Sequence, residues 1–453
     1  MTALRVLVGL VTTALVASGC DAPDRVTPSV VAHAPAACTV SGTTVGGSMV
    51  ITDPQVLARF GFTRTMGQIR TTARVGADVT TRSLWQAWMR TFAASPAPGD
   101  CDDVDVHGYG LRCPRTAEAT LAAVDPFSAT SRVRFEPVAL VNRFDLGPGS
   151  GFHCGVYRII YAMRSSDPAV GGRAFLAFDG ALYNPRLVAG GPDGCVPVWR
   201  FWQALSADAD PASRADQLER FFYLGTAVPG FGAVVRAGNY GLADGVDAVH
   251  GEGEITGNFF VDEVEWNLRR YQLRRTCAPT GCGLRFELVP LPSTPADELF
   301  ADTSPLTNAE RKALGVAVRA SSLQFDRLNF VLPTPDDWNE LESVVATPPT
   351  AAAVRYDLRT SPYLRRFIGF DLNHNGGDLT IDDALRRATT QTCAGCHGVS
   401  SGVALGGGLT WPASLGAVHI DESGALSPAL TDLFLPMRIA RLEAFINRTC
   451  PAE

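Results

Sequence analysis

Short apolar runs rich in β-branched and aromatic residues recur along much of the chain and predict β-strands. They form two groups, at residues 138–144, 156–162 and 174–178, and then at 254–261, 264–273 and 283–289. Apolar residues at helical spacing predict helices at 81–89, 196–205, 212–223, 308–322 and 336–345. Strands in clusters followed by helices predict an α+β domain over residues 41–345.

The last quarter of the chain has a different pattern. A Pro- and Ala-rich segment at residues 346–354 predicts a linker. Beyond it, helical spacing predicts helices at 363–370, 381–392 and 430–446. The predicted fold class is therefore an α+β N-terminal domain followed by a small, mostly α domain over residues 355–453.

The first twenty residues predict export. Arg5 precedes an apolar stretch at residues 6–17 that is too short to cross a bilayer as a stable helix. The stretch ends in Ala17-Ser18-Gly19-Cys20, which resembles the lipobox of bacterial lipoproteins. The resemblance implies that residues 1–20 are a signal peptide, that Cys20 carries a lipid, and that residues 21–40 are a tether. The alternative is an ordinary secretory signal in which Cys20 has no role.

Either alternative places the mature protein outside the cytoplasm, facing the periplasm or the cell surface. With a lipid on Cys20, its first partner is a membrane, inner or outer. No later stretch is apolar for long enough to form a membrane-spanning helix.

Composition is that of a packed globular protein, with 46% hydrophobic and 19% charged residues among 453. Acidic residues outnumber basic ones, 46 to 39, and no Lys/Arg-rich run is present, which argues against a nucleic-acid partner. Three of the 11 cysteines belong to motifs at Cys20, Cys393 and Cys396, and the even remainder fits disulfides. Proximity suggests Cys101–Cys113 and Cys277–Cys282, and Cys154–Cys195 and Cys38–Cys450 are the pairs that remain.

The motif with the clearest chemistry is Cys393-Ala394-Gly395-Cys396-His397. Cys-x-x-Cys-His is typical of c-type haem attachment, in which the two thiols bond the porphyrin and the histidine ligates the iron. With a helix before it and a long amphipathic helix after it, the region of residues 355–450 resembles a class I cytochrome c. The resemblance implies that Cys393 and Cys396 carry the haem thioethers and that His397 is the proximal ligand.

The sixth iron ligand has two candidates. Met437, in a Pro-Met pair, resembles the distal ligand of such cytochromes, and His419 is the rival. An open sixth position is the third alternative, and it would favour gas binding or peroxide chemistry. Without haem, the cysteine pair could instead be a redox-active dithiol, a plain disulfide or half of a zinc site.

The segment before the haem motif resembles an EF-hand calcium loop. Asp371, Asn373, Asn375 and Asp383 would supply oxygen ligands. The loop has one extra residue before Leu379, and Asp383 replaces the usual terminal glutamate. The alternative is a turn in which Thr380 caps the next helix.

These features predict an exported lipoprotein with one covalent haem that passes single electrons to or from a redox protein. Two alternatives are a peroxidase-like haem enzyme and a disulfide-rich, ligand-binding lipoprotein without haem. Residues 41–345 carry no recognised family motif and contain no phosphate loop or nucleophile elbow. Residues 141–146 are expected to form a strand end with a buried ion pair.

Overall fold

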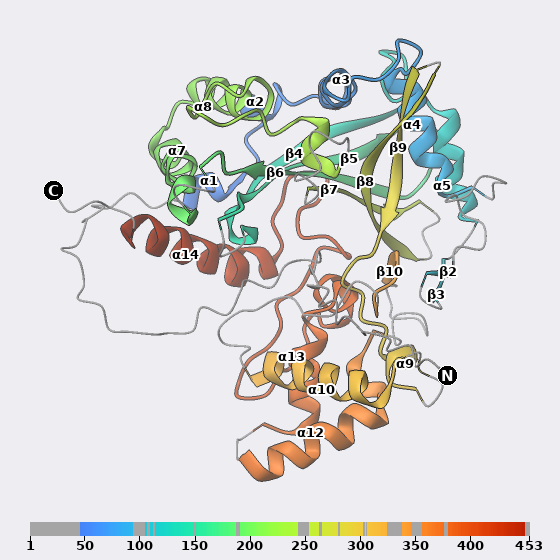
Figure 1. Cartoon of the computed structure of the whole chain (residues 1–453), viewed down its shortest axis with the longest axis vertical. Coiled ribbons are helices and arrows are strands. Elements are labelled where there is room, and N and C mark those ends of the chain that lie inside the picture. The colour runs from blue at the N-terminus through green and yellow to red at the C-terminus, as the bar shows by residue number, and fades with distance from the viewer. Residues whose placement is uncertain are drawn as a thin grey trace, which may run out of the picture.

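The computed structural model is a mixed helix-and-sheet protein (Figure 1). It describes residues 46–448 except for 94–104, 107–108, 112–113, 148–150, 187–190, 243–252, 262–264, 280, 302–303, 305, 324–337, 346–355 and 376–378. The predicted signal peptide, Cys20, the tether and the linker therefore lie outside the described residues. No helix among the described residues is long and apolar enough to cross a membrane.

An antiparallel sheet occupies the centre of the molecule (Figure 1). Within the described residues it has eight strands in the order β1-β4-β5-β6-β7-β8-β10, and β9 also pairs with β8. Its strands are β1 (Val50–Ile51), β4 (Val133–Arg143), β5 (His153–Ser165), β6 (Arg173–Tyr183), β7 (Glu254–Phe260), β8 (Trp266–Ala278), β9 (Gly281–Val289) and β10 (Glu342–Val345). A separate short hairpin joins β2 (Asp105–Val106) and β3 (Tyr109–Gly110).

Both faces of the sheet are covered, which explains the nearly continuous apolar runs of its strands. Successive side chains of a strand point to opposite faces. Ile159 and Tyr161 of β5 pack into the larger core, whereas Ile160 and Ala162 pack against residues 405–434. The sheet therefore separates two hydrophobic clusters.

Helices from the first half of the chain cover one face (Figure 1). They are α1 (Gly46–Met49), α2 (Pro54–Leu57), α3 (Phe62–Thr72), α4 (Thr81–Arg90), α5 (Thr116–Thr120), α7 (Val196–Ala207) and α8 (Pro211–Glu219). Helix α4 has a capping box in which Thr80 Oγ1 accepts from the Ser83 amide.

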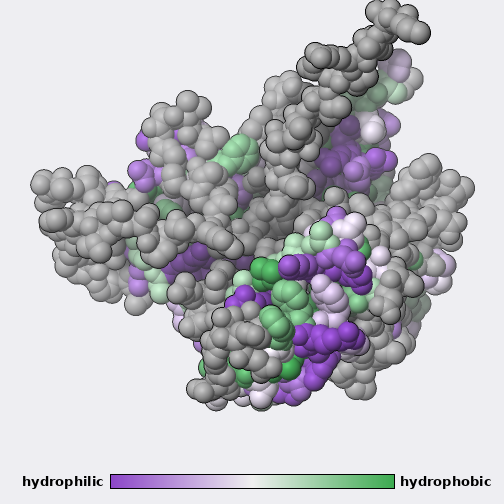
Figure 2. All heavy atoms as spheres, turned by 60° about the horizontal axis from the view of Figure 1, so that its bottom comes forward, coloured by the Kyte–Doolittle hydropathy of each residue, from purple (hydrophilic) through white to green (hydrophobic). Residues whose placement is uncertain are grey.

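A third, helical cluster lies beyond the sheet and consists of α9 (Ala296–Leu299), α10 (Asn308–Leu323), α12 (Pro362–Asn375) and α13 (Ile381–Thr389). Its buried residues come from both sides of the predicted linker, for example Leu314 and Leu385. Figure 2 looks onto the end of the molecule that carries α12, where hydrophilic and hydrophobic residues both reach the surface. Among its large apolar side chains, Phe370 of α12 is 69% exposed.

The C-terminal helix α14 (Leu435–Arg448) packs against the large core as well. Its Leu442 and Ile446 are buried in the cluster formed by the sheet and the first helices, and Phe445 contacts Trp199 with ring centroids 4.2 Å apart. The ion pair between Arg173 of β6 and Glu422, at 2.6 Å, further ties the C-terminal segment to the sheet. The hydrophobic clusters thus run across the predicted boundary at residues 346–354.

Most predicted strands and helices are found within a few residues of their expected positions. The predicted helix at 336–345 is wrong, because its described part contains strand β10, which pairs with the first residues of β8. The predicted helix at 430–446 begins as a π-helical segment, Ala429–Phe434, before α14. The predicted disulfide Cys277–Cys282 is confirmed, and Cys154–Cys195 is also present. The other two predicted disulfides lie outside the described residues.

Candidate functional site

A cavity of about 310 Å³ lies between the sheet and residues 391–441. Strands β4 to β8 supply one wall, with apolar side chains such as Val141, Phe175 and Leu268. The opposite wall contains Cys393, Cys396, His397, His419 and Met437, which are all the candidate haem-binding residues. The structure therefore brings together five residues that the sequence singled out, and the volume is in the range of small-molecule pockets, about 300–1,000 Å³.

The Cys393–His397 motif is held in a tight turn after α13. Cys393 begins a helical turn that continues as a π-helical turn over Gly395–Val399, a form frequent at functional sites. The Cys393 amide donates to Pro292 O at 3.1 Å, and the Gly395 amide donates to Thr392 Oγ1 at 3.0 Å. A Cβ on Gly395 would lie 1.7 Å from Thr389 O, so only glycine fits at position 395.

The two motif cysteines are not disulfide-bonded, and both side chains are half-buried. The Cys396 Sγ lies 3.4 Å from His419 Nε2. The cavity is thus lined by two thiols next to two imidazoles.

His397 is oriented by a backbone carbonyl. Its Nδ1 lies 3.0 Å from Ala417 O, and because a carbonyl can only accept, Nδ1 carries the proton. Its Nε2 makes no hydrogen bond among the described residues, so it can coordinate a metal. Burial lowers the pKa of His397 to about 4, and the hydrogen bond to Ala417 opposes this shift only weakly. The imidazole is therefore neutral at pH 7, which is the form that ligates metals.

Two aromatic rings contact His397. The indole of Trp266, at the start of β8, has its centroid 4.9 Å from the His397 ring, and the imidazole of His419 lies 4.8 Å away. Trp266 is 3% exposed. It therefore closes one side of the imidazole.

His419 is fixed by Ser427, whose Oγ lies 3.0 Å from His419 Nδ1. Burial lowers the pKa of His419 well below its ordinary value, and His397 and Arg438 add to this effect. Because the two histidine rings are in direct contact, both could ligate one iron only if they moved apart. Met437, at the start of α14, is half-buried and packs in the cluster that includes Phe434.

A charged cluster lies in the same cavity. Asp145 accepts two hydrogen bonds from Arg143 Nε and Nη2, at about 3.1 Å, and Arg438 Nε lies 3.5 Å from it. Burial alone would raise the pKa of Asp145, but Arg143 and Arg438 lower it to about 2. The expected ion pair in residues 141–146 is confirmed, but the sequence did not indicate that it lines the cavity.

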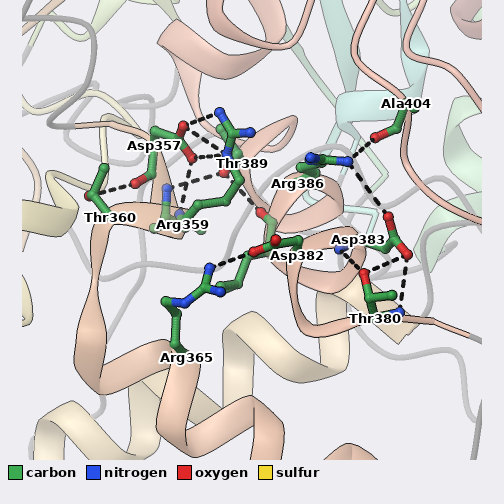
Figure 3. Close-up of polar contacts among 12 residues, drawn as sticks. Asp357, Arg359, Thr360, Arg365, Thr380, Asp382, Asp383, Arg386, Thr389 and Ala404 are labelled. Carbon is green, nitrogen blue, oxygen red and sulfur yellow. Dashed lines mark hydrogen bonds and ion pairs between the residues drawn. The ribbon is translucent and has the colours of Figure 1, made fainter.

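At the end of the predicted calcium loop, the Asp383 carboxylate contacts Thr380 and Arg386 (Figure 3). Helix α12 includes the backbone of residues 371–375, so the expected alternate ligands do not lie in a loop. The side chains of Asp371, Asn373 and Asn375 lie outside the described residues. Asp383 forms a capping box with Thr380 at the start of α13, as the alternative interpretation expected. Among the described residues no group of three or more His, Cys, Asp or Glu could hold a metal ion, so calcium binding remains an unsupported prediction.

Trp266 and Arg438 were not predicted as site residues. Neither belongs to a motif: Arg438 lines the cavity and Trp266 packs against His397, both through long-range packing. The sequence carries no signal that could have found Trp266. Comparison of the chain with family models, with curated proteins and with solved structures finds no match.

Proposed function

We propose that this chain is an exported lipoprotein that binds one haem covalently at Cys393 and Cys396, with His397 as the proximal ligand. The observation that carries the proposal is the state of His397. Its Nδ1–H donates to Ala417 O, and its Nε2 has no other partner among the described residues of the cavity that the two thiols also line. Ligating histidines usually donate their second ring nitrogen to a carbonyl or carboxylate in this way.

A bound haem would supply single-electron transfer. The chain's own residues would orient and shield the site. Ala417 fixes the His397 ring, and Trp266 packs on it. The apolar side chains of β4, β6 and β8 would exclude water from most of the cavity. Such burial and ligation are the means by which a protein tunes a haem. We propose Met437 as the sixth ligand, because His419 already contacts Cys396 and His397 on the motif side.

The experiment is expression with a haem maturation system, followed by haem staining after denaturing electrophoresis. Wild-type protein should retain stain, because thioether bonds survive denaturation, and C393A/C396A should lose it. The matched control C277A/C282A removes two cysteines far from the motif and should stain normally. Colourless wild-type protein would refute the proposal.

The lipid anchor is tested separately. We propose that Cys20 holds the mature chain on a membrane that faces the periplasm or the cell surface. C20S should move the protein from the membrane fraction to the soluble exported fraction without changing haem staining. Wild-type protein that is soluble after export would refute the anchor alone.

A second candidate is thiol–disulfide exchange. It is favoured by the 3.4 Å contact between Cys396 Sγ and His419 Nε2, since a neutral imidazole can accept a thiol proton. In that case the purified protein would be colourless, and Cys393 and Cys396 would cycle between dithiol and disulfide in a glutathione buffer. H419A should then slow alkylation of Cys396.

A further inference from the structure

Three arginines face a single carboxylate in the cavity. Arg143 ends β4, Asp145 lies in the following 3₁₀ turn (Phe144–Leu146), and Arg438 and Arg441 lie three residues apart on α14. Arg143 and Arg438 contact Asp145 directly, and Arg441 lines the same cavity. Residues three apart on a helix share a face, so both α14 guanidiniums are directed to the same region.

The other charges that line the cavity occur in matched pairs. Arg158 binds Asp179 through both Nε and Nη2, at 2.5 and 2.7 Å, and Arg270 Nη1 lies 3.1 Å from Glu254. Among the residues that the structure describes, the lining contains five arginines and three carboxylates, which leaves an excess of two positive charges. The excess belongs to the cluster of Arg143, Arg438 and Arg441 around Asp145.

Excess charge of one sign is costly in a partly buried cavity because little water is present to solvate it. Arg438 is only 6% exposed. Guanidinium groups bind carboxylates through two parallel hydrogen bonds, so a ligand with two carboxylates would match both the charge and the geometry of the cluster.

We infer that the Arg143–Arg438–Arg441 cluster is a binding site for a pair of carboxylate groups. Two sources have this chemistry: the two propionates of the haem, or a separate small dicarboxylate. The first source rests on the proposed haem attachment. The second does not depend on haem.

The test is calorimetric titration with succinate. It uses two proteins, the wild type after haem maturation and the C393A/C396A variant. Each is titrated both as it is and with the additional substitution R441Q. Succinate should bind at least one preparation, and R441Q should weaken binding about tenfold, the effect of losing one charge-assisted pair of hydrogen bonds. The control R59Q changes an exposed arginine that pairs with Asp216 and Glu219, and it should have no effect. R441K keeps the charge but loses the planar guanidinium that forms two parallel hydrogen bonds, so it should weaken binding several-fold. It provides the test if R441Q fails to fold.

The outcomes separate the two sources. Binding to C393A/C396A but not to haem-loaded protein assigns the site to the propionates. Binding to both, with the same dependence on Arg441, assigns it to a separate dicarboxylate. Absence of succinate binding in both preparations, or binding that neither R441Q nor R441K weakens, overturns the inference. If wild-type protein lacks haem, the proposed function fails, but succinate binding that depends on Arg441 would still support the site.

Discussion

The indole ring of Trp266 packs on the imidazole of His397, with ring centroids 4.9 Å apart and planes inclined by 31°. Trp266 is the first residue of β8, and His397 belongs to the Cys393–His397 motif far along the chain. The central sheet therefore supports the candidate iron ligand directly. Residues 41–345 thus supply a wall of the site, although the sequence assigned them no role.

Trp266 should be important for stability. W266A removes a nearly fully buried indole and should lower the free energy of unfolding by about 3–5 kcal/mol, the usual cost of such a cavity. Urea denaturation of the haem-free protein measures this. The control L224A truncates a side chain that is 57% exposed and should change stability by less than about 0.5 kcal/mol. Equal losses of stability in the two variants would contradict the burial of Trp266 against His397.

The sixth ligand can be identified by carbon monoxide. If the haem is attached and Met437 ligates the iron, M437A should open the sixth position and allow ferrous protein to bind carbon monoxide. H419A should leave the position closed. The absorption spectrum with and without carbon monoxide gives the answer. The opposite pattern would make His419 the ligand, and carbon monoxide binding by the wild-type protein would indicate an open site.

The haem-free protein should lose stability in mild acid. His397 has a pKa of about 4 in the folded protein and about 6.5 when unfolded, so between these values only the unfolded chain binds the proton. Stability should be full above pH 6.5 and fall as the pH drops towards 4. For His397 the loss is at most about 3 kcal/mol, because its partial exposure to the cavity reduces the cost of charging it.

His419, whose pKa is also lowered by burial, should add to this loss in the same direction. Urea denaturation of C393A/C396A between pH 7 and pH 4 measures it. The same protein with H397N should show a shallower pH dependence. An unchanged slope would contradict the buried, neutral state of His397.

The two described disulfides should differ in their effect on stability. Cys154–Cys195 closes a loop with a sequence separation of 41, and Cys277–Cys282 closes one with a separation of 5. Loop-closure entropy predicts losses of about 4 kcal/mol for C154A/C195A and about 2 kcal/mol for C277A/C282A. Thermal and urea denaturation of the two variants should preserve this order. A reversed order would mean that strain or residual structure dominates.

The features that the sequence predicted correctly are those determined by residues close together in the chain. The motif at Cys393–His397 was visible because its residues are contiguous, and strands such as β5 were visible from their apolar composition. The cap at Thr380 was visible for the same reason, since its partner Asp383 is three residues away.

Long-range pairing explains what the sequence did not show. The described residues at the end of the predicted 336–345 helix form a strand because Glu342–Val345 pairs with β8, where the Glu342 carboxylate lies 3.1 Å from Arg269 Nη2. Local propensity cannot reveal such a partner. Trp266 meets His397, and Arg438 reaches the cavity, by the same kind of contact, so no spacing in the sequence connects them with His397.

The position of α14 has a consequence for protein engineering. Because Leu442 and Ile446 are buried in the large core and Trp266 covers His397, residues 355–453 could not be grafted onto another protein as a portable unit. Excision of residues 355–453 would expose the face of the sheet that they cover and remove a wall of the cavity. The chain must be transplanted whole, or the imidazole would face bulk water.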